Sequence, residues 1–188
     1  RRSIKDVELN KNYVLIVSTN AGLWGYNTGD TVAFVSLKPC RIIVTGRHKH
    51  FISAFGEHVI GSEVEKALKE ATDQTGISVK EFTVAPMINP VKGLPFHQWW
   101  IEFHGNPSIK EVELVAKKTD NSLRQINSYY SDLIQGKVLR PLMIISVQKG
   151  GFKNYMESEG KLGGQNKLPR LSNNREIVDK INPFKQKE

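Results

Sequence analysis

Asp30 has the type and the setting of a residue that binds a nucleotide. An ionised carboxylate only accepts hydrogen bonds, and its two oxygens can receive both hydroxyl groups of a ribose. Gly29 beside it permits the close backbone approach that a nucleotide requires. The two residues close the run Tyr26-Asn27-Thr28-Gly29-Asp30, which reads Y-x-T-G-D. A Gly-Asp turn without a ligand is common, so the offsets of Tyr26 and Thr28 are what favour Tyr26 and Asp30 as nucleotide-binding residues.

Arg47 is the next candidate, because a guanidinium offers a rigid fan of donors to ribose or phosphate oxygens. The β-branched runs at residues 31–37 and 41–45, joined by Lys38-Pro39, predict a hairpin between Asp30 and Arg47. Such a hairpin would return the chain to the same site. The alternative interpretation is a surface arginine at the end of a strand.

Lys167 is a candidate for phosphate chemistry. It lies in the glycine-rich segment Gly163-Gly164-Gln165-Asn166-Lys167-Leu168-Pro169-Arg170, where the glycines make the approach flexible and Pro169 stiffens the backbone after the lysine. A lysine on such a loop could reach the α-phosphate of a nucleotide and neutralise the charge that builds as pyrophosphate departs. The alternative is a solvent-exposed lysine in a surface loop.

The first part of the chain is rich in strands. Strands are predicted at residues 13–17, 31–37 and 41–45, and no helical pattern is present to cover them. Strand pairs without a covering layer cannot bury one of their faces. We therefore expect residues 1–48 to be the β-rich end of a larger domain.

Residues 49–188 instead mix strands with helices. A helix should begin near Ser62, where Ser62 and Glu65 have the S-x-x-E capping-box form, and end at Gly76. The other predicted elements are strands at 51–55, 81–85, 98–103 and 142–147, a long helix from 106, a short helix after 150, and a terminal helix capped by Ser172 or Asn173. This β-α-β-β-α-β order with added helices predicts an α+β domain whose helices pack on a sheet.

The composition is that of an ordinary globular chain. Of its 188 residues, 39% are hydrophobic and 24% are charged, and the single cysteine, Cys40, excludes an internal disulfide or a cysteine-built metal site. The sequence has no apolar run of membrane-spanning length and no signal-peptide core, so we expect no membrane partner and a cytoplasmic location. The net charge of +8 would attract anions such as nucleotide phosphates.

The region that begins at Gly46 resembles the hinge region of adenylate-forming enzymes. These enzymes use ATP to activate a carboxylic acid as an acyl-adenylate. In acyl- and aryl-CoA ligases this region reads G-R-x-K-D-x-I-x-x-x-G-x-x-V, followed by E-x-E at the opening of a helix. The corresponding residues here, without a gap, are Gly46, Arg47, Lys49, Ile52, Gly56, Val59, Glu63 and Glu65. One departure is His50, which replaces the usual aspartate and leaves any salt bridge of that aspartate in question.

The whole chain is similar to the auxin-responsive acyl-acid amido synthetase family, and in particular to its bacterial members. Three segments carry the resemblance: Gly22-Leu23-Trp24-Gly25-Tyr26-Asn27-Thr28-Gly29-Asp30, residues 45–57, and residues 160–173. Plant members carry an Asn-Gln-x-Lys-x-Pro-Arg element near the C-terminus, which Asn166-Lys167-Leu168-Pro169-Arg170 resembles.

This resemblance implies a two-step ligase. An acid and ATP, with magnesium as its counter-ion, give an acyl-adenylate and pyrophosphate; an amine, usually an amino acid, then releases AMP. Asp30 would hold the ribose with Tyr26, Arg47 would assist, Lys49 would be the hinge, Gly56 would belong to the lid motif, and Lys167 would bind phosphate. Gly25 stands where a basic residue is common, so a phosphate contact from that position is lost. Residues 49–188 would be the C-terminal lid domain, and an N-terminal large domain would be a further partner, without which we expect no activity.

Two other functions compete with this one. A nucleic-acid-binding module would use the basic surface and an exposed sheet face carrying Trp99 or Trp100. A non-catalytic interaction domain would have kept the lid fold alone. Metal catalysis by the five histidines is disfavoured, because His48, His50 and His58 lack a helical spacing with a carboxylate partner. We expect small-molecule substrates, no nucleic acid and no resident metal, and leave open the acid, the acceptor and whether a thiol replaces the amine.

Overall fold

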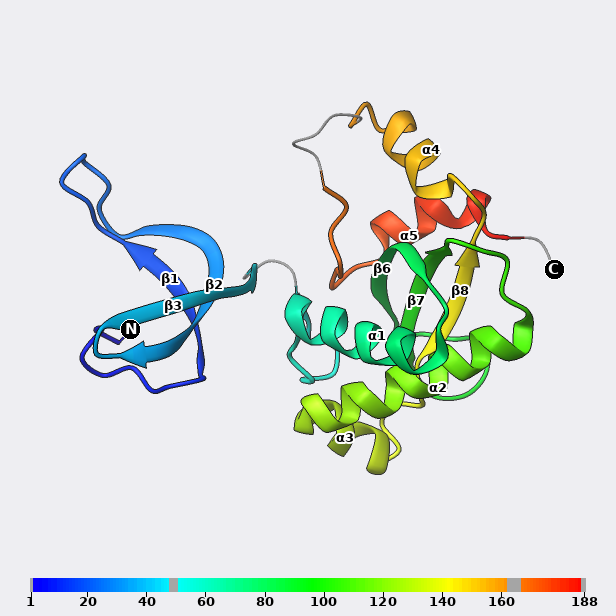
Figure 1. Cartoon of the computed structure of the whole chain (residues 1–188), viewed down its shortest axis with the longest axis horizontal. Coiled ribbons are helices and arrows are strands. Elements are labelled where there is room, and N and C mark those ends of the chain that lie inside the picture. Colours follow the sequence, from blue (N-terminus) through cyan, green and yellow to red (C-terminus); the bar gives the residue numbers. More distant parts are fainter. Residues whose placement is uncertain (1, 48–50, 162–166, 187–188) are drawn as a thin grey trace.

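A computed structural model describes residues 2–47, 51–161 and 167–186. Figure 1 shows a β-sheet formed by the N-terminal residues and a larger part in which helices surround a second sheet. The mixed α+β class predicted from the sequence is confirmed. Within the described residues, no helix is both long and apolar enough to cross a membrane.

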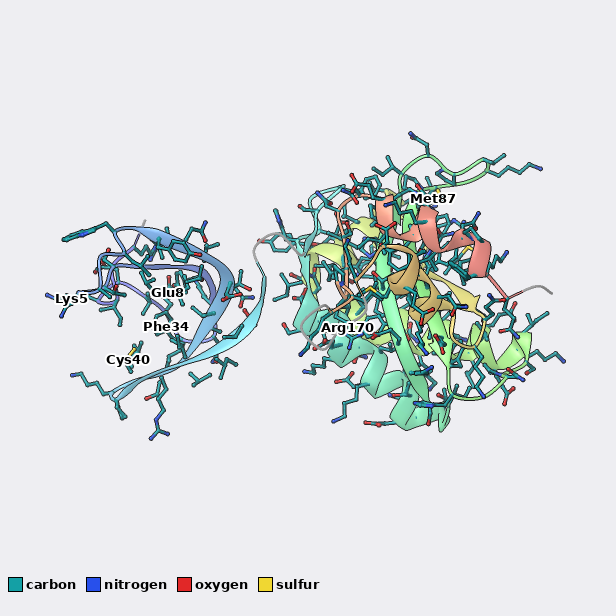
Figure 2. All side chains as sticks on the ribbon, turned by 90° about the horizontal axis from the view of Figure 1, so that it is seen from above. Lys5, Glu8, Phe34, Cys40, Met87 and Arg170 are labelled. Carbon is teal, nitrogen blue, oxygen red and sulfur yellow. The ribbon has the colours of Figure 1, made fainter. Side chains whose placement is uncertain are left out.

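The N-terminal sheet is antiparallel and has the order β1-β2-β3, with β1 at Asn12–Val17, β2 at Tyr26–Leu37 and β3 at Cys40–Arg47. Its small core contains Phe34, which packs edge-on against Tyr13 with ring centroids 5.8 Å apart (Figure 2). Other apolar side chains stay in solvent, including Val44 at 69% exposure. The predicted hairpin is confirmed. Several large apolar side chains of this sheet remain exposed, which is unusual for the surface of a folded domain.

A short hairpin opens the second part, with β4 at Phe51–Ile52 and β5 at Val59–Ile60. The strand expected over residues 51–55 is shorter because the chain turns back at Gly56, which has φ +92°. Helix α1 follows at Gly61–Thr75 and ends at Gly76, as predicted, and Gly76 takes the left-handed conformation. The predicted cap at Ser62 is wrong, since Glu63 accepts the Ile60 N–H at 3.0 Å and so caps the helix two residues earlier.

The central sheet has the order β6-β7-β8, with β6 at Val79–Met87, β7 at Phe96–Phe103 and β8 at Met143–Val147. Strands β6 and β7 are antiparallel, whereas β8 runs parallel to β7. A parallel neighbour requires a crossover, which α2 at Ile109–Ile126 and α3 at Ser128–Gln135 provide. Helix α2 is capped reciprocally by Ser108 and Glu111, and Asn127 ends it by capping α3.

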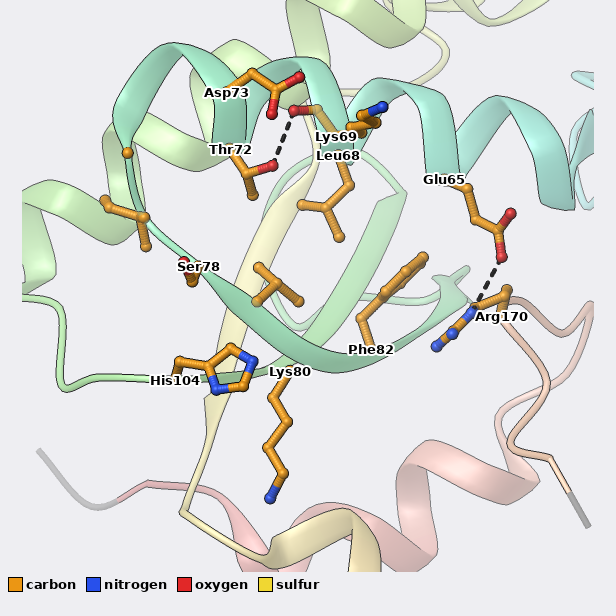
Figure 3. Close-up of a pocket in the computed structure, with 13 residues that line it drawn as sticks. Glu65, Leu68, Lys69, Thr72, Asp73, Ser78, Lys80, Phe82, His104 and Arg170 are labelled. Atoms are coloured by element: carbon orange, nitrogen blue, oxygen red, sulfur yellow. Dashed lines mark hydrogen bonds and ion pairs between the residues drawn. The ribbon is translucent and has the colours of Figure 1, made fainter. Parts of the chain in front are cut away.

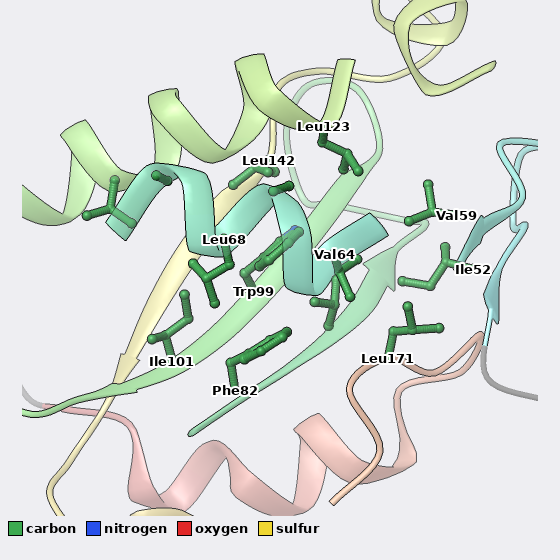
Figure 4. Packing of buried hydrophobic residues seen from close by; sticks show 14 of the residues in the cluster. Ile52, Val59, Val64, Leu68, Phe82, Trp99, Ile101, Leu123, Leu142 and Leu171 are labelled. Carbon is green, nitrogen blue, oxygen red and sulfur yellow. The ribbon is translucent and has the colours of Figure 1, made fainter. Parts of the chain in front are cut away.

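Trp99 and Trp100 show that both faces of the central sheet are covered. Adjacent residues of a strand point to opposite faces, and these two are 0% and 3% exposed. The Trp99 face packs against α1 and α2 through residues such as Leu68 and Leu123 (Figure 4). The Trp100 face packs against α4 at Gly151–Ser158 and α5 at Glu176–Ile181. An exposed aromatic sheet face, which the nucleic-acid alternative required of these tryptophans, is therefore not present.

The C-terminal helices differ in one detail from the prediction. A short helix does follow Gly150, but neither Ser172 nor Asn173 caps α5. Arg175 is its N-cap residue, and the Asn174 side chain accepts the Glu176 N–H at 3.3 Å. The 3-10 helix η1 at Asn182–Phe184 then closes the described chain.

Candidate functional site

Residues 28–30 form an irregular bulge in the middle strand of the N-terminal sheet. The pairing of β1 with β2 shifts there, so Leu15 alone lies opposite these residues. The Thr28 hydroxyl donates to the Leu15 carbonyl at 3.2 Å and accepts the Asp30 N–H at 3.2 Å. Gly29 takes φ +78°, a conformation that residues with a side chain rarely adopt. The Y-x-T-G-D run therefore ends in a β-bulge whose hydrogen bonds fix the backbone at Asp30.

Asp30 and Arg47 are brought together, as the predicted hairpin requires. The two residues are register partners in the pairing of β2 with β3. Asp30 is half-buried, while Tyr26 at the start of β2 is 53% exposed. All three residues thus lie on one small sheet, with Asp30 and Arg47 directly paired at its end. Lys49 lies outside the described residues.

Glu57 fastens the turn that contains Gly56 to the core. Its side chain is fully buried, accepts the Phe55 N–H at 2.8 Å and contacts His97 on β7, with 2.8 Å between Oε1 and Nε2. Burial pushes the pKa of the Glu57 carboxyl upward, but the His97 hydrogen bond and charge and the backbone N–H groups together outweigh burial and lower that pKa. The Nδ1 atom of His97 has no hydrogen-bond partner within the described residues.

Lys167 lies exposed at the start of a segment that we call the strap, residues 167–173. The strap runs along the outer edge of β6, where Val84 pairs with Leu171 in parallel. Val84 donates its N–H to the Arg170 carbonyl and accepts the Ser172 N–H, both at 2.9 Å. An isolated β-bridge thus attaches the strap to the edge of the three-stranded central sheet, a short distance beyond the candidate lysine.

Arg170 fixes the strap to two other elements. Its Nε donates to Glu65 of α1 at 3.2 Å (Figure 3), and its Nη1 forms an ion pair with Glu81 of β6. The guanidinium carbon also lies 4.9 Å from the centre of the Phe82 ring. Glu65, expected from the sequence to cap α1, serves this contact instead.

Between α1 and the β6 edge lies an open groove of about 660 Å³ (Figure 3). Its lining includes Leu68, Phe82 and three cationic residues, Lys69, Lys80 and Arg170. Lys80 contacts the buried Glu102 carboxylate at 2.7 Å and Arg170 holds the glutamates described above, whereas the Lys69 side chain is exposed. Two of the three cationic residues in the groove are thus already engaged by carboxylates.

Sequence reasoning missed Arg170 and the Glu57–His97 pair. Arg170 stood in the quoted Asn166–Arg170 element, and Glu57 followed Gly56 directly, so both had a local signal. His97 had none, because its partner lies in a distant turn. Within the described residues, no group of three or more His, Cys, Asp or Glu side chains could hold a metal ion.

Residues 62–176, more than half of the chain, match the GH3 family C-terminal domain, and residues 2–47 match the GH3 family central domain. The chain belongs to the GH3 family. It is similar to two Arabidopsis thaliana proteins, the indole-3-acetic acid-amido synthetases GH3.4 and GH3.6, each at 26% identity. The match covers 89% of the chain and 30% of GH3.4, and 94% of the chain and 30% of GH3.6. The chain thus spans less than a third of these curated relatives.

Solved structures agree with this assignment at the level of the fold. The chain is similar to the GH3.15 acyl acid amido synthetase, with a TM-score of 0.77 at 20% identity over 99% of the chain and 36% of that protein. A structure of the same enzyme in complex with 2,4-DB gives a TM-score of 0.74 at 19% identity, over 99% of the chain and 35% of that protein. The recognition of an amido synthetase family from the sequence is confirmed.

Proposed function

We propose that this chain is the C-terminal part of an ATP-dependent ligase that joins a carboxylic acid to an amino acid or another amine through an acyl-adenylate. Membership of the GH3 family, whose relatives are named as amido synthetases, supports this function. The single observation that carries it within the chain is the pairing of Asp30 with Arg47 beside the bulge at residues 28–30.

The first step would be attack of a carboxylate oxygen on the α-phosphorus of ATP. A bond forms between that oxygen and phosphorus, the bond to pyrophosphate breaks, and pyrophosphate leaves with its negative charge. The residues present fit the ribose of ATP, since Asp30 supplies a carboxylate that can accept hydroxyl protons, and its backbone register partner Arg47 is a residue type that donates. Asp30 and Tyr26 would bind and orient the nucleoside, and Arg47 would assist at the ribose or phosphate.

Lys167 would act when pyrophosphate departs. Its positive charge would stabilise the oxygens that gain charge in that transition state. Magnesium would accompany ATP as its counter-ion. In the second step the amine nitrogen would attack the carbonyl carbon, lose a proton and expel AMP, so that the carboxylate oxygen transferred in step one leaves with AMP.

For this chemistry the chain would divide near Lys49. Residues 1–48 would belong to a large nucleotide-binding domain, and residues 49–188 would form a lid that carries Lys167. Two observations support the division: β1–β3 form a sheet separate from β6–β8 (Figure 1), and the strap that begins at Lys167 is bridged to β6, whereas Asp30 lies on β2. A lid that rotates about Lys49 would let the two residues act at one site. The 188-residue chain alone would then be inactive, since it spans only 30% of the length of GH3.4 and GH3.6.

Hydroxylamine trapping tests the function without knowledge of the acceptor. Hydroxylamine attacks an acyl-adenylate and yields a hydroxamate, so a panel of acids can be scored with the full-length protein. We expect hydroxamate that requires both the acid and ATP and that falls in the Asp30→Ala variant. Formation of ADP in place of AMP with the accepted acid would contradict an adenylate mechanism.

A further inference from the structure

We propose that Arg170 is a positioning residue for Lys167: its contacts with Glu65 and Glu81 hold the strap so that Lys167 reaches the reacting phosphate. The inference rests on the proposed function, because it assigns a supporting residue to the same site. Arg170 itself does not touch the substrate in this account. It would act through the backbone that leads to Lys167.

Side chains of the strap pack into the core on both faces of the central sheet. Leu168, next to Lys167, packs with the buried residues on the Trp100 face, whereas Leu171 packs on the Trp99 face. Thr83 on β6 also donates its hydroxyl to the Pro169 carbonyl at 2.8 Å. Lys167 is the first residue of this anchored strap. The anchor therefore restricts the position of its backbone, although its side chain lies in solvent.

Arg170 is the charged element of this anchor. One planar guanidinium contacts carboxylates on two different elements, α1 and β6, and lies over the Phe82 ring. Its loss would leave both Glu65 and Glu81 without this cation and would remove the side-chain link between the strap, α1 and β6. A lysine would keep the charge but not the fork that reaches both partners.

Asn173 ties the far end of the strap to the region that follows the proposed hinge. Its Oδ1 accepts the Ser53 N–H at 3.0 Å, and Ile52 belongs to the same buried cluster as Leu171 (Figure 4). The turn with Gly56 and the strap with Lys167 are thus joined, although more than a hundred residues separate them in sequence. A rotation of the chain at Lys49 would carry Lys167 with it through this contact.

The test compares R170Q and R170K with N173A in the full-length enzyme, in single-turnover assays of each half-reaction. Misplacement of a group by about 1 Å can cost on the order of a hundredfold in rate. We therefore expect adenylation to fall by about tenfold or more in R170Q, and less in R170K. Amide formation from a supplied acyl-adenylate should change little. In a Lys167→Ala background, R170Q should add almost nothing, because the residue that it positions is already absent.

R140Q is the matched control. Arg140 also stacks on a phenylalanine, with its guanidinium carbon 3.8 Å from the centre of the Phe96 ring, and donates to the Leu94 carbonyl, but it does not contact the strap. It should leave both half-reactions unchanged. If R170Q does not fold, the half-reaction rates of R170K and N173A test the positioning role instead.

Amide hydrogen exchange at Ser172 and Val84 gives a readout that does not depend on activity, and it should accelerate in R170Q. Equal losses in both half-reactions, or losses that add to those of Lys167→Ala, would overturn the positioning role. Faster exchange with unchanged adenylation would overturn it also. A wild-type enzyme without acid-dependent AMP formation would instead refute the proposed function and this inference with it, while exchange would still report the anchor.

Discussion

Asp30 and Arg47 are register partners across β2 and β3, so the backbones of the two residues lie opposite each other at one end of the same hairpin. The hairpin alone does not set the backbone at Asp30. The Thr28 hydroxyl also holds the bulge at residues 28–30, because it donates a hydrogen bond to the Leu15 carbonyl and accepts one from the Asp30 N–H. The Y-x-T-G-D run and the dipeptide Gly46-Arg47 thus belong to one local structure.

Asp30→Asn should weaken the use of ATP in the full-length enzyme. The amide keeps the shape but loses the charge and one acceptor oxygen, and hydrogen bonds to a charged group contribute about 1.5–3 kcal/mol. We expect a higher Michaelis constant for ATP, measured by AMP release. Asp6→Asn, on an exposed residue of the same part of the chain, is the control. An unchanged constant and turnover would remove Asp30 from the site.

Lys167→Ala should separate the two half-reactions. If the Lys167 charge acts as pyrophosphate departs, adenylation should slow by about a hundredfold while acid binding barely changes. Amide formation from a supplied acyl-adenylate should survive, since that step expels no pyrophosphate. Lys161→Ala is matched, because Lys161 is also exposed and lies in the same stretch of sequence. Equal losses in both steps would withdraw the catalytic role.

Glu57→Gln should lower the free energy of unfolding at neutral pH. It should also make that free energy depend less on pH under acidic conditions. The folded pKa of Glu57 lies below its ordinary value near 4.5, so the unfolded state binds the proton more tightly. The stability that Glu57 contributes is therefore present above about pH 4.5 and is lost as the pH falls through the folded pKa. The amide keeps the shape but loses the charge and one of the two oxygens that serve Phe55 and His97, and hydrogen bonds to a charged group contribute about 1.5–3 kcal/mol. Urea unfolding of both chains at several pH values measures this. A difference between them that does not shrink in acid would contradict it.

Leu171→Ala tests the packing of the strap. Leu171 is fully buried, and truncation of a buried leucine typically costs about 2–5 kcal/mol. Leu114→Ala makes the same chemical change at a residue that is 44% exposed on α2, and it should cost far less. Thermal unfolding of the 188-residue chain would compare them. Similar midpoints for the two variants would mean that the strap does not contribute to the core.

Much of the fold could be predicted from local patterns. Strand runs, the left-handed Gly76 and the hairpin at residues 38–39 depend on neighbours in sequence, and the structure confirms them. The helix caps were less predictable. Glu63 and Glu65 stand two residues apart, and only the packing of α1 decides that Glu63 caps it and Glu65 turns to Arg170.

The candidate site shows the same limit. Asp30 and Arg47 could be paired in advance because a tight hairpin fixes which residues face one another. The contacts of Glu57 with His97 and of Ser53 with Asn173 join residues that are far apart in sequence, and no local pattern encodes such partners. The burial of both Trp99 and Trp100 likewise depends on helices that cover both faces of the sheet.

Transfer of ¹⁸O from a labelled acid tests the central claim most directly. The full-length enzyme would be supplied with ATP, an accepted acid with a doubly labelled carboxylate and its amine acceptor, and the phosphorus products would be analysed by mass spectrometry. An acyl-adenylate requires that one labelled oxygen leave with AMP when the amine attacks, so we expect labelled AMP and unlabelled pyrophosphate. Label in inorganic phosphate together with ADP would show an acyl phosphate instead and would contradict the account.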